Sequence, residues 1–181
     1  ADRFATLLRR GRYADAAAIA RAAGQEGRAP LLERMAEAPI YVVTPETGTA
    51  TIPWARSYPT PLVRVKLNGE RVLMAIDTGA NDLLLDTGAA KRYRVQPVSG
   101  QHTEFWAGTR LAVGNALVQR LELGPFKIER IPAGTISLHR WSLEVNPQGE
   151  AVAGVIGLNL LRRFTPTLDY TKLRLELARG P

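Results

Sequence analysis

Two aspartates in this sequence stand in a setting that could support acid–base chemistry. Asp77 opens the tetrapeptide Asp-Thr-Gly-Ala at 77–80, directly after the apolar run 72–76, and Asp86 opens the same tetrapeptide at 86–89. A carboxylate at the end of a buried strand needs a partner or a proton, because burial disfavours its ionised form. Such a group can serve as a general acid or base. The structural alternative is an Asx-turn, in which the aspartate only caps its own loop.

Other catalytic chemistries lack the residues they need. The chain has no cysteine, which excludes disulfides, thiolate nucleophiles and zinc sites built on sulfur. Its two histidines, His102 and His139, lie in separate segments without the spacing of a metal motif. No G-x-S-x-G, G-x-G-x-x-G or G-x-x-x-x-G-K sequence occurs. We therefore expect no metal and no cofactor.

The charge of the chain is basic but scattered. Lys and Arg outnumber Asp and Glu by 24 to 17, a net charge of +7. Nucleic-acid binding uses a clustered basic patch, whereas the basic runs here, at 9–10, 91–94 and 162–163, are short and far apart. We expect a solvated basic surface without a nucleic-acid partner, and a nucleic-acid binder remains an alternative that rests on charge alone. The longest apolar run, 151–161, is interrupted by two glycines and an asparagine, so no transmembrane segment is predicted.

Mainly β structure is predicted around the aspartates. Residues 62–67 alternate apolar and basic, and Asn68-Gly69 then separates them from a returning strand at 71–76, which is typical of a tight hairpin. Asp86 is placed to cap a helix over 88–93. Further strands are expected at 83–85, 110–113, 117–123, 126–131 and 134–138, followed by an apolar run at 154–157, a short helix at 158–164 and a closing hairpin that joins 167–170 with 173–177.

The first third of the chain differs in character. Residues 1–38 are predicted to be a helical N-terminal extension, interrupted at Gly11 and Gly24, with Pro30 opening a third helix. The stretch 8–17 weakly resembles the turn region of a tetratricopeptide repeat, but such repeats are stable only when stacked, and one unit is present. The alternative is an extension that packs on the main domain or on a dimer partner. Residues 39–60 are rich in loop-forming residues and proline, which predicts a linker with one short strand near 40–43.

Two stretches resemble a known enzyme family. These are 61–85, with Asp77-Thr78-Gly79 at its centre, and the run 154–161, about eighty residues later, with paired apolar residues followed by glycine. Together they resemble the retropepsin-like aspartic proteases, specifically the single-domain bacterial type, and the resemblance extends over a domain at 61–178. It implies a closed, β-barrel-like acid protease domain behind the helical extension. The implied function is an aspartic endopeptidase that hydrolyses peptide bonds in proteins.

The resemblance assigns a catalytic role to Asp77, Thr78 and Gly79. Aspartic protease chemistry uses two carboxylates that share one proton, and one usable motif per chain implies a homodimer in which the two Asp77 carboxylates activate a water. Asp86 does not complete the pair, because it stands where the family begins a helix. The largely extended run between the two aspartates also spans roughly 15 Å or more at about 3.3 Å per residue.

The resemblance also indicates how the substrate cleft is built. Substrate is expected to contact Ala80, Asn81 and Asp82, and a flap hairpin over 101–113. The flap residues proposed at its tip are Phe105, Trp106 and Gly108; the residues expected to support the acid's loop from behind are Val155, Ile156 and Gly157. Two alternatives stay open for the flap: Trp106 could belong to the core, and 115–117 is a second possible turn.

The sequence departs from the viral members of the family at two coupled positions. Those proteins carry an acidic residue four after the catalytic aspartate and an arginine after the second glycine, and the two form an ion pair at the dimer interface. Asn81 and Leu158 stand here, so both halves are missing together and no buried charge is left unpaired. The strength of the dimer is open, and the helical extension could add interface.

A second class of function fits the same fold. A catalytically silent protein-binding module could present the cleft or the helical extension to a partner. The retained Asp, Thr and Gly argue against it. The chain opens with Ala1 instead of Met, and the resemblance includes exported bacterial members, which together predict the periplasm or the cell envelope.

Overall fold

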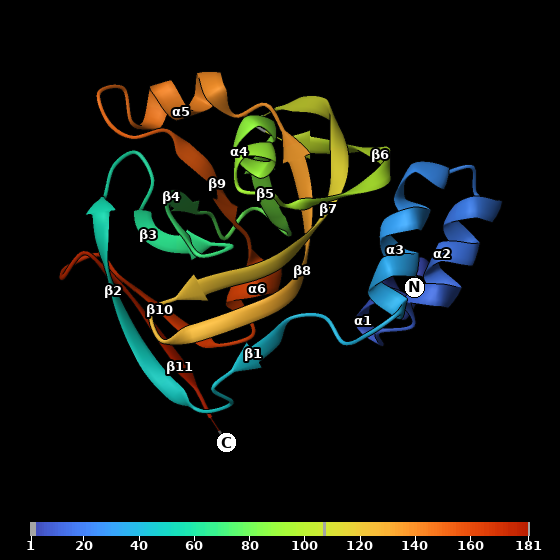
Figure 1. The fold of residues 1–181 in the computed structure, drawn as a ribbon, viewed down its shortest axis with the longest axis horizontal. Coiled ribbons are helices and arrows are strands. Elements are labelled where there is room, and N and C mark those ends of the chain that lie inside the picture. Colours follow the sequence, from blue (N-terminus) through green and yellow to red (C-terminus); the bar gives the residue numbers. More distant parts are fainter. Residues whose placement is uncertain (1–2, 107, 181) are drawn as a thin grey trace.

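The structure, a computed structural model, describes residues 3–106 and 108–180, and the side chains of these residues except 104–106. The chain begins with helices that lie on one side of a larger β-structure (Figure 1). These are α1 (Arg3–Arg9), α2 (Tyr13–Ala22), the 3-10 turn η1 (Glu26–Arg28) and α3 (Ala29–Ala36). We refer to residues 3–36 as the helical segment. The helices predicted at the N-terminus are therefore present.

The helical segment has a small hydrophobic core of its own. Gly11 and Gly24 have φ values of +69° and +70°, in the left-handed region that glycine adopts without strain, and they follow α1 and α2. The turns bring the apolar faces together. The fully packed members of this core are Leu7, Ala16, Ala17, Ala20, Ala29 and Leu32. Most of them are alanines, so the helices approach closely but bury little area.

The rest of the chain forms a mixed sheet with short helices at its connections. The strands are β1 (Val42–Thr44), β2 (Gly48–Arg56), β3 (Leu62–Leu67), β4 (Glu70–Ile76), β5 (Leu83–Asp86), β6 (Gln96–Trp106), β7 (Thr109–Leu123), β8 (Phe126–Ile136), β9 (Val152–Ile156), β10 (Thr165–Asp169) and β11 (Arg174–Arg179). The helices are α4 (Thr87–Arg92), α5 (His139–Val145) and α6 (Leu158–Leu161).

Six strands of this sheet close into a ring. The order β3-β4-β9-β5-β8-β7 returns to its start because Lys66 and Leu67 of β3 also pair with Glu122 and Leu121 of β7. Strands β4 and β9 are parallel, as are β5 and β8, and the other pairs in the ring are antiparallel. A ring leaves its strands without free edges. The predicted closed, mainly β fold is confirmed.

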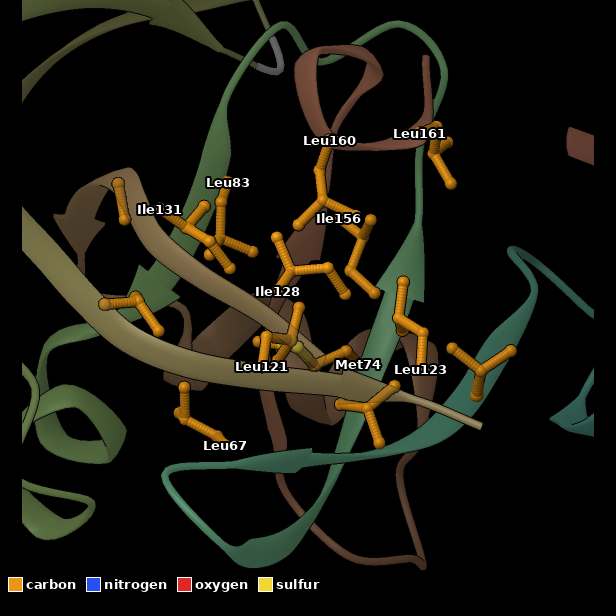
Figure 2. Close-up of a cluster of buried hydrophobic side chains, with 14 of the residues drawn as sticks. Leu67, Met74, Leu83, Leu121, Leu123, Ile128, Ile131, Ile156, Leu160 and Leu161 are labelled. Carbon is orange, nitrogen blue, oxygen red and sulfur yellow. The ribbon is translucent and has the colours of Figure 1, made fainter. Parts of the chain in front are cut away.

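The main hydrophobic core fills this ring. Met74 of β4, Leu121 of β7 and Ile156 of β9 are fully buried and point toward one another (Figure 2). The alternation in β3 explains the inward and outward faces, since Val63, Val65 and Leu67 are buried while Arg64 and Lys66 are exposed. Leu160 and Leu161 bring α6 onto the same core, which fixes the helix that follows β9.

Several sequence predictions differ from the observed elements. The predicted linker at 39–60 contains both β1 and the nine-residue β2, which pairs with β11 over Gly48–Pro53 and with β3 at Trp54. Ala50 and Ile52 are buried in it, a short alternation concealed by the neighbouring prolines. The strands predicted at 110–113 and 117–123 are one strand, β7, and those at 126–131 and 134–138 are one strand, β8, ending at Ile136. The helix α5 was not predicted.

The helical segment packs against the sheet through unusually close backbone contacts. A Cβ on Gly27 of η1 would lie 1.6 Å from the backbone oxygen of Gln101, and one on Gly100 would lie 2.3 Å from the oxygen of Gly27. Buried Asn115 of β7 donates from Nδ2 to the Gly27 oxygen at 2.6 Å and to the Ser99 oxygen at 3.0 Å. The irregularity in the β6–β7 register between Val98 and Gln101 lies at this contact. The segment is thus joined to the base of the β6–β7 hairpin.

Substitution of Gly27 by alanine tests this joint. We expect Gly27→Ala to lower the free energy of unfolding by about 1–3 kcal/mol, the usual cost of overpacking. We also expect faster hydrogen exchange in residues 3–36 while the ring strands stay protected, as measured by mass spectrometry. The matched control is Gly180→Ala, where an added Cβ meets nothing within 4 Å. Unchanged exchange in residues 3–36 would contradict the assignment of Gly27 as the point of attachment.

Candidate active site

The loop that carries Asp77 begins where two parallel strands end together. Ile76 of β4 is in register with Ile156 of β9, and the backbone N–H of Asp77 donates to the oxygen of Ile156 at 3.1 Å. The loop is then held to the start of α6, since the N–H of Leu158 donates to the oxygen of Ala80 at 2.8 Å. These bonds fix both ends of the loop independently of any side chain.

The carboxylate of Asp77 combines a local hydrogen bond with access to solvent. Its Oδ1 accepts from the backbone N–H of Gly79 at 2.8 Å, which is the Asx-type contact expected of the structural alternative. Asp77 is nevertheless partly exposed, and Thr78 and Gly79 are exposed. No described residue donates a hydrogen bond to Oδ2 of Asp77. One oxygen therefore orients the carboxylate, and the other is available to a water or to a second carboxyl group.

The residues predicted to support this loop lie directly behind it. Val155 and Ile156 are buried in the middle of the ring, between β4 and β5. A Cβ on Gly157 would lie 2.4 Å from the backbone oxygen of Asp82 and 2.9 Å from that of Ala80. Only glycine lets the two segments approach this closely. Gly157 therefore determines how closely the loop of Asp77 packs against the turn between β9 and α6.

Asp82 has two partners that sequence reasoning missed. Its Oδ1 accepts from Nδ2 of Asn159 at 2.5 Å, and its Oδ2 lies 3.4 Å from Nη2 of Arg28 in η1. Asn159 could have been recognised as a polar residue two positions after Gly157. Arg28 could not, because it is 54 residues away in sequence. Ala80 is buried and Asn81 is exposed, so the predicted substrate-contacting residues 80–82 have three different environments.

Asp86 has the structural role that the sequence predicts. It is the N-cap of α4, and its Oδ2 accepts from the backbone N–H of Ala89 at 3.0 Å. Its Oδ1 accepts from the backbone N–H of Leu138 at 2.9 Å. Both oxygens are thus bound to backbone, at the end of β5 away from the loop of Asp77. The second Asp-Thr-Gly-Ala motif holds α4 and the segment after β8 in place.

The predicted flap is a long β-hairpin formed by β6 and β7. Trp106 pairs with Thr109, and Gly108 has a φ of +81° at the turn. The alternative turn at 115–117 is wrong, because these residues lie inside β7 and pair with β6 and β8. The side chains of Phe105 and Trp106 lie outside the described part of the structure, so their contact with substrate stays a prediction.

The described residues offer one candidate catalytic carboxylate and no metal centre. No group of three or more His, Asp or Glu residues in ranges 3–106 and 108–180 could hold a metal ion. Near the acid's loop, burial raises the pKa of the Tyr41 hydroxyl above its ordinary value, and the charge of Asp82 adds to the rise. The guanidinium of Arg163 lies 4.3 Å from the centre of the Tyr41 ring.

Comparison with known families identifies the protease part of the chain. A sequence model of the family described as "gag-polyprotein putative aspartyl protease" matches residues 63–163, which is more than half of the chain. The matched range includes Asp77, Gly157 and the β6–β7 hairpin. It begins after the helical segment. No curated protein matches the sequence significantly.

Three solved structures resemble the chain at low sequence identity. A retropepsin-like aspartic protease from Rickettsia conorii is 17% identical with a TM-score of 0.49, covering 77% of this chain and 94% of that one. The retroviral protease-like domain of Ddi1 from Leishmania major is 14% identical with a TM-score of 0.41, covering 67% and 94%. The EIAV protease complexed with the inhibitor HBY-793 is 14% identical with a TM-score of 0.41, covering 59% and 89%.

The contrast between the two aspartates predicts unequal effects of their substitution on stability. We expect Asp86→Ala to lower the free energy of unfolding by about 1–2 kcal/mol, because a helix cap is lost. Asp77→Asn keeps an oxygen that can accept from Gly79, so its unfolding free energy should stay within about 0.5 kcal/mol of the wild type. Urea denaturation of both variants measures the difference. A larger loss for Asp77→Asn than for Asp86→Ala would contradict the assigned roles.

Proposed function

The chain belongs to the retropepsin-like aspartyl protease family, and from this premise we propose that it is an aspartic endopeptidase that hydrolyses peptide bonds in proteins as a homodimer. The observation that carries the proposal is the Asp77 carboxylate, delivered by a buried strand into an exposed loop. That loop is supported from behind by Gly157. Its Gly79 N–H contact orients the carboxylate and leaves Oδ2 available to a water.

The proposed mechanism is general acid–base hydrolysis by two Asp77 carboxyl groups. Two like charges at short distance do not both ionise, so the pair holds one shared proton. The ionised member removes a proton from the attacking water, and the protonated member donates to the carbonyl oxygen of the scissile bond. Thr78 would bond across the dimer axis, and Gly79 would permit the close approach. No metal, cofactor or covalent intermediate takes part.

In this proposal a second copy of the chain supplies the other acid, because the second Asp-Thr-Gly-Ala motif of the same chain does not. Asp86 has both oxygens bound to backbone N–H groups, at the far end of β5. The surface around Asp77 suits a two-fold contact. Thr78, Gly79, Asn81 and Leu158 are exposed there, and Leu158 is 41% exposed although it is a large apolar residue. Two such loops facing each other would bury Leu158 from both copies.

The alternative is a protein-binding module on the same fold. A module of this kind has no use for paired carboxylates on a dimer axis, so the retained Asp77-Thr78-Gly79 sequence favours catalysis. No helix among the described residues is long and apolar enough to span a membrane. The periplasm or cell envelope is the compartment we propose, and cell fractionation checks it.

Cleavage of an unfolded protein tests the function. We expect the wild type to digest reduced casein between acid and neutral pH, with a dimeric mass in solution. Asp77→Asn should lower the rate about 10³-fold or more, since it removes the group that moves protons. Asp86→Asn should keep most of the activity, because asparagine is also a good helix cap.

Each other outcome of this experiment has a definite meaning. A folded dimer that cleaves nothing and is unaffected by Asp77→Asn favours the binding module. Cleavage of casein by a protein that is monomeric by its mass in solution would contradict the mechanism in which two chains share the carboxyl pair. Loss of activity in Asp86→Asn with a normal unfolding free energy would show that the wrong aspartate has been assigned.

The dimer contact can be tested at Leu158. We expect Leu158→Asp to raise the dimer dissociation constant by about 10- to 100-fold, because it removes an apolar side chain from each copy and adds a charge. Analytical ultracentrifugation measures the constant. The matched control is Leu143→Asp. Leu143 is also an exposed leucine, at 51%, but it belongs to α5, which precedes β9, whereas Leu158 begins α6 directly after β9, beside the loop of Asp77. Equal effects of the two substitutions would contradict a dimer axis near Asp77.

A further inference from the structure

A cavity of about 260 Å³ lies between the helical segment and the protease part of the chain. Apolar side chains of α1 and α3, including Leu8, Leu31 and Met35, form one wall. The opposite wall contains Asp82 from the loop of Asp77, Asn159 from α6 and His102 from β6. The cavity therefore exists only because the helical segment is docked at this place.

The cavity adjoins both parts of the proposed substrate cleft. Asp82 follows Asp77 by five residues in the same loop. His102 belongs to the β6–β7 hairpin, and its Nδ1 lies 3.0 Å from Oδ1 of Asn115, the residue that holds Gly27. A peptide lying between the loop and the hairpin would reach this cavity beyond the residues next to the cleaved bond.

The charges around the cavity favour an anionic group. Four arginines line it, namely Arg9, Arg28, Arg162 and Arg163, and Asp82 is the only acidic residue among the described lining residues. Tyr41, also in the lining, is neutral like any tyrosine near neutral pH, and burial raises its pKa further. The combination of apolar walls and excess positive charge suits an apolar side chain that has a carboxylate beside it.

Arg28 is the arginine best placed to select such a group. The close contact of Gly27 with Gln101 fixes the backbone next to it. Its Nη2 lies 3.4 Å from Oδ2 of Asp82, a long contact between side chains that are 33% and 23% exposed. The other oxygen of Asp82 accepts a 2.5 Å bond from Asn159, so Arg28 is not the only partner of this carboxylate. A second carboxylate could therefore take one edge of the guanidinium in a paired, charge-assisted contact.

We propose that this cavity is an outer substrate subsite, built in part by the helical segment, that binds an apolar residue with an acidic neighbour, and that Arg28 determines the preference for the acidic residue. The proposal rests on the proposed function, since the ligand is the substrate of the same site. It makes residues 3–36 a part of the working enzyme and excludes their removal before catalysis.

Cleavage-site profiling of a peptide library tests the proposal. We expect wild-type cuts to be enriched about three- to tenfold for Asp or Glu at one fixed position away from the cleaved bond, in keeping with one partly exposed charge-assisted contact. Arg28→Gln should abolish this enrichment and leave the preference at the two residues flanking the bond unchanged. Two peptides that differ only by Glu or Gln at that position then give the ratio of kcat/KM directly.

Two further variants separate recognition from a structural effect. Arg21→Gln is the matched control, because Arg21 pairs with Glu33 on the exposed side of the helical segment and does not line the cavity. The double variant Arg28→Glu, Asp82→Asn reverses the charge of residue 28 and removes the neighbouring carboxylate, so this pair of residues changes from neutral to a charge of −1. It should shift the enrichment to Lys or Arg, which a merely destabilised segment would not do.

The outcomes distinguish this proposal from the proposed function. Two profiling results overturn the subsite alone: cleavage without an acidic preference, and an acidic preference that survives Arg28→Gln. An intact mass that shows loss of residues 3–36 from the active enzyme also overturns the subsite alone. Binding of the Glu peptide to Asp77→Asn, weakened by Arg28→Gln, supports the subsite even if no variant cleaves. Neither cleavage nor binding of either peptide rejects both proposals.

Discussion

The arrangement of the site depends on the contact between the loop of Asp77 and the turn at Gly157. Strands β4 and β9 end together, and the two segments that follow them are joined by backbone hydrogen bonds, from Leu158 to Ala80 and from Asn159 to Asn81, as well as by the side-chain bond from Asn159 to Asp82. A single added carbon on Gly157 would collide with the oxygens of Asp82 and Ala80. Because the backbone bonds at both ends of the loop do not depend on a side-chain rotamer, the position of the acid is set mainly by the strands of the ring.

The repeated tetrapeptide shows that surroundings, not residue types, decide what an aspartate does. Asp77 follows a buried strand and meets solvent, with one oxygen bound to Gly79. Asp86 stands between a strand and a helix, where free backbone N–H groups of α4 and of Leu138 take both of its oxygens. Because both of its oxygens are bound at the start of this helix, Asp86 is not available for acid–base chemistry.

The sequence predicted correctly those features that depend on a few neighbouring residues, such as tight turns and helix caps. Asn68 and Gly69 have the positive φ values of a tight hairpin, at 50° and 92°, and Asp86 caps its helix. Contacts between distant segments were missed. Strand β2 is stabilised by β11, more than a hundred residues later, and Arg28 meets Asp82 only after the helical segment docks. The sequence near each partner has no pattern that identifies the other, so these pairings could not be deduced from one sequence.

The helical segment contacts two parts of the candidate site, the β6–β7 hairpin and the loop of Asp77. Its η1 turn contacts the base of the β6–β7 hairpin through Gly27 and reaches the loop of Asp77 through Arg28. A hairpin that opens over a cleft must bend at its base, and here the base is held by backbone-to-backbone packing and by buried Asn115. Rigid docking at that point restricts the hinge. Under the proposed function, any opening of the hairpin over the cleft has to leave this docked part of the hairpin in place.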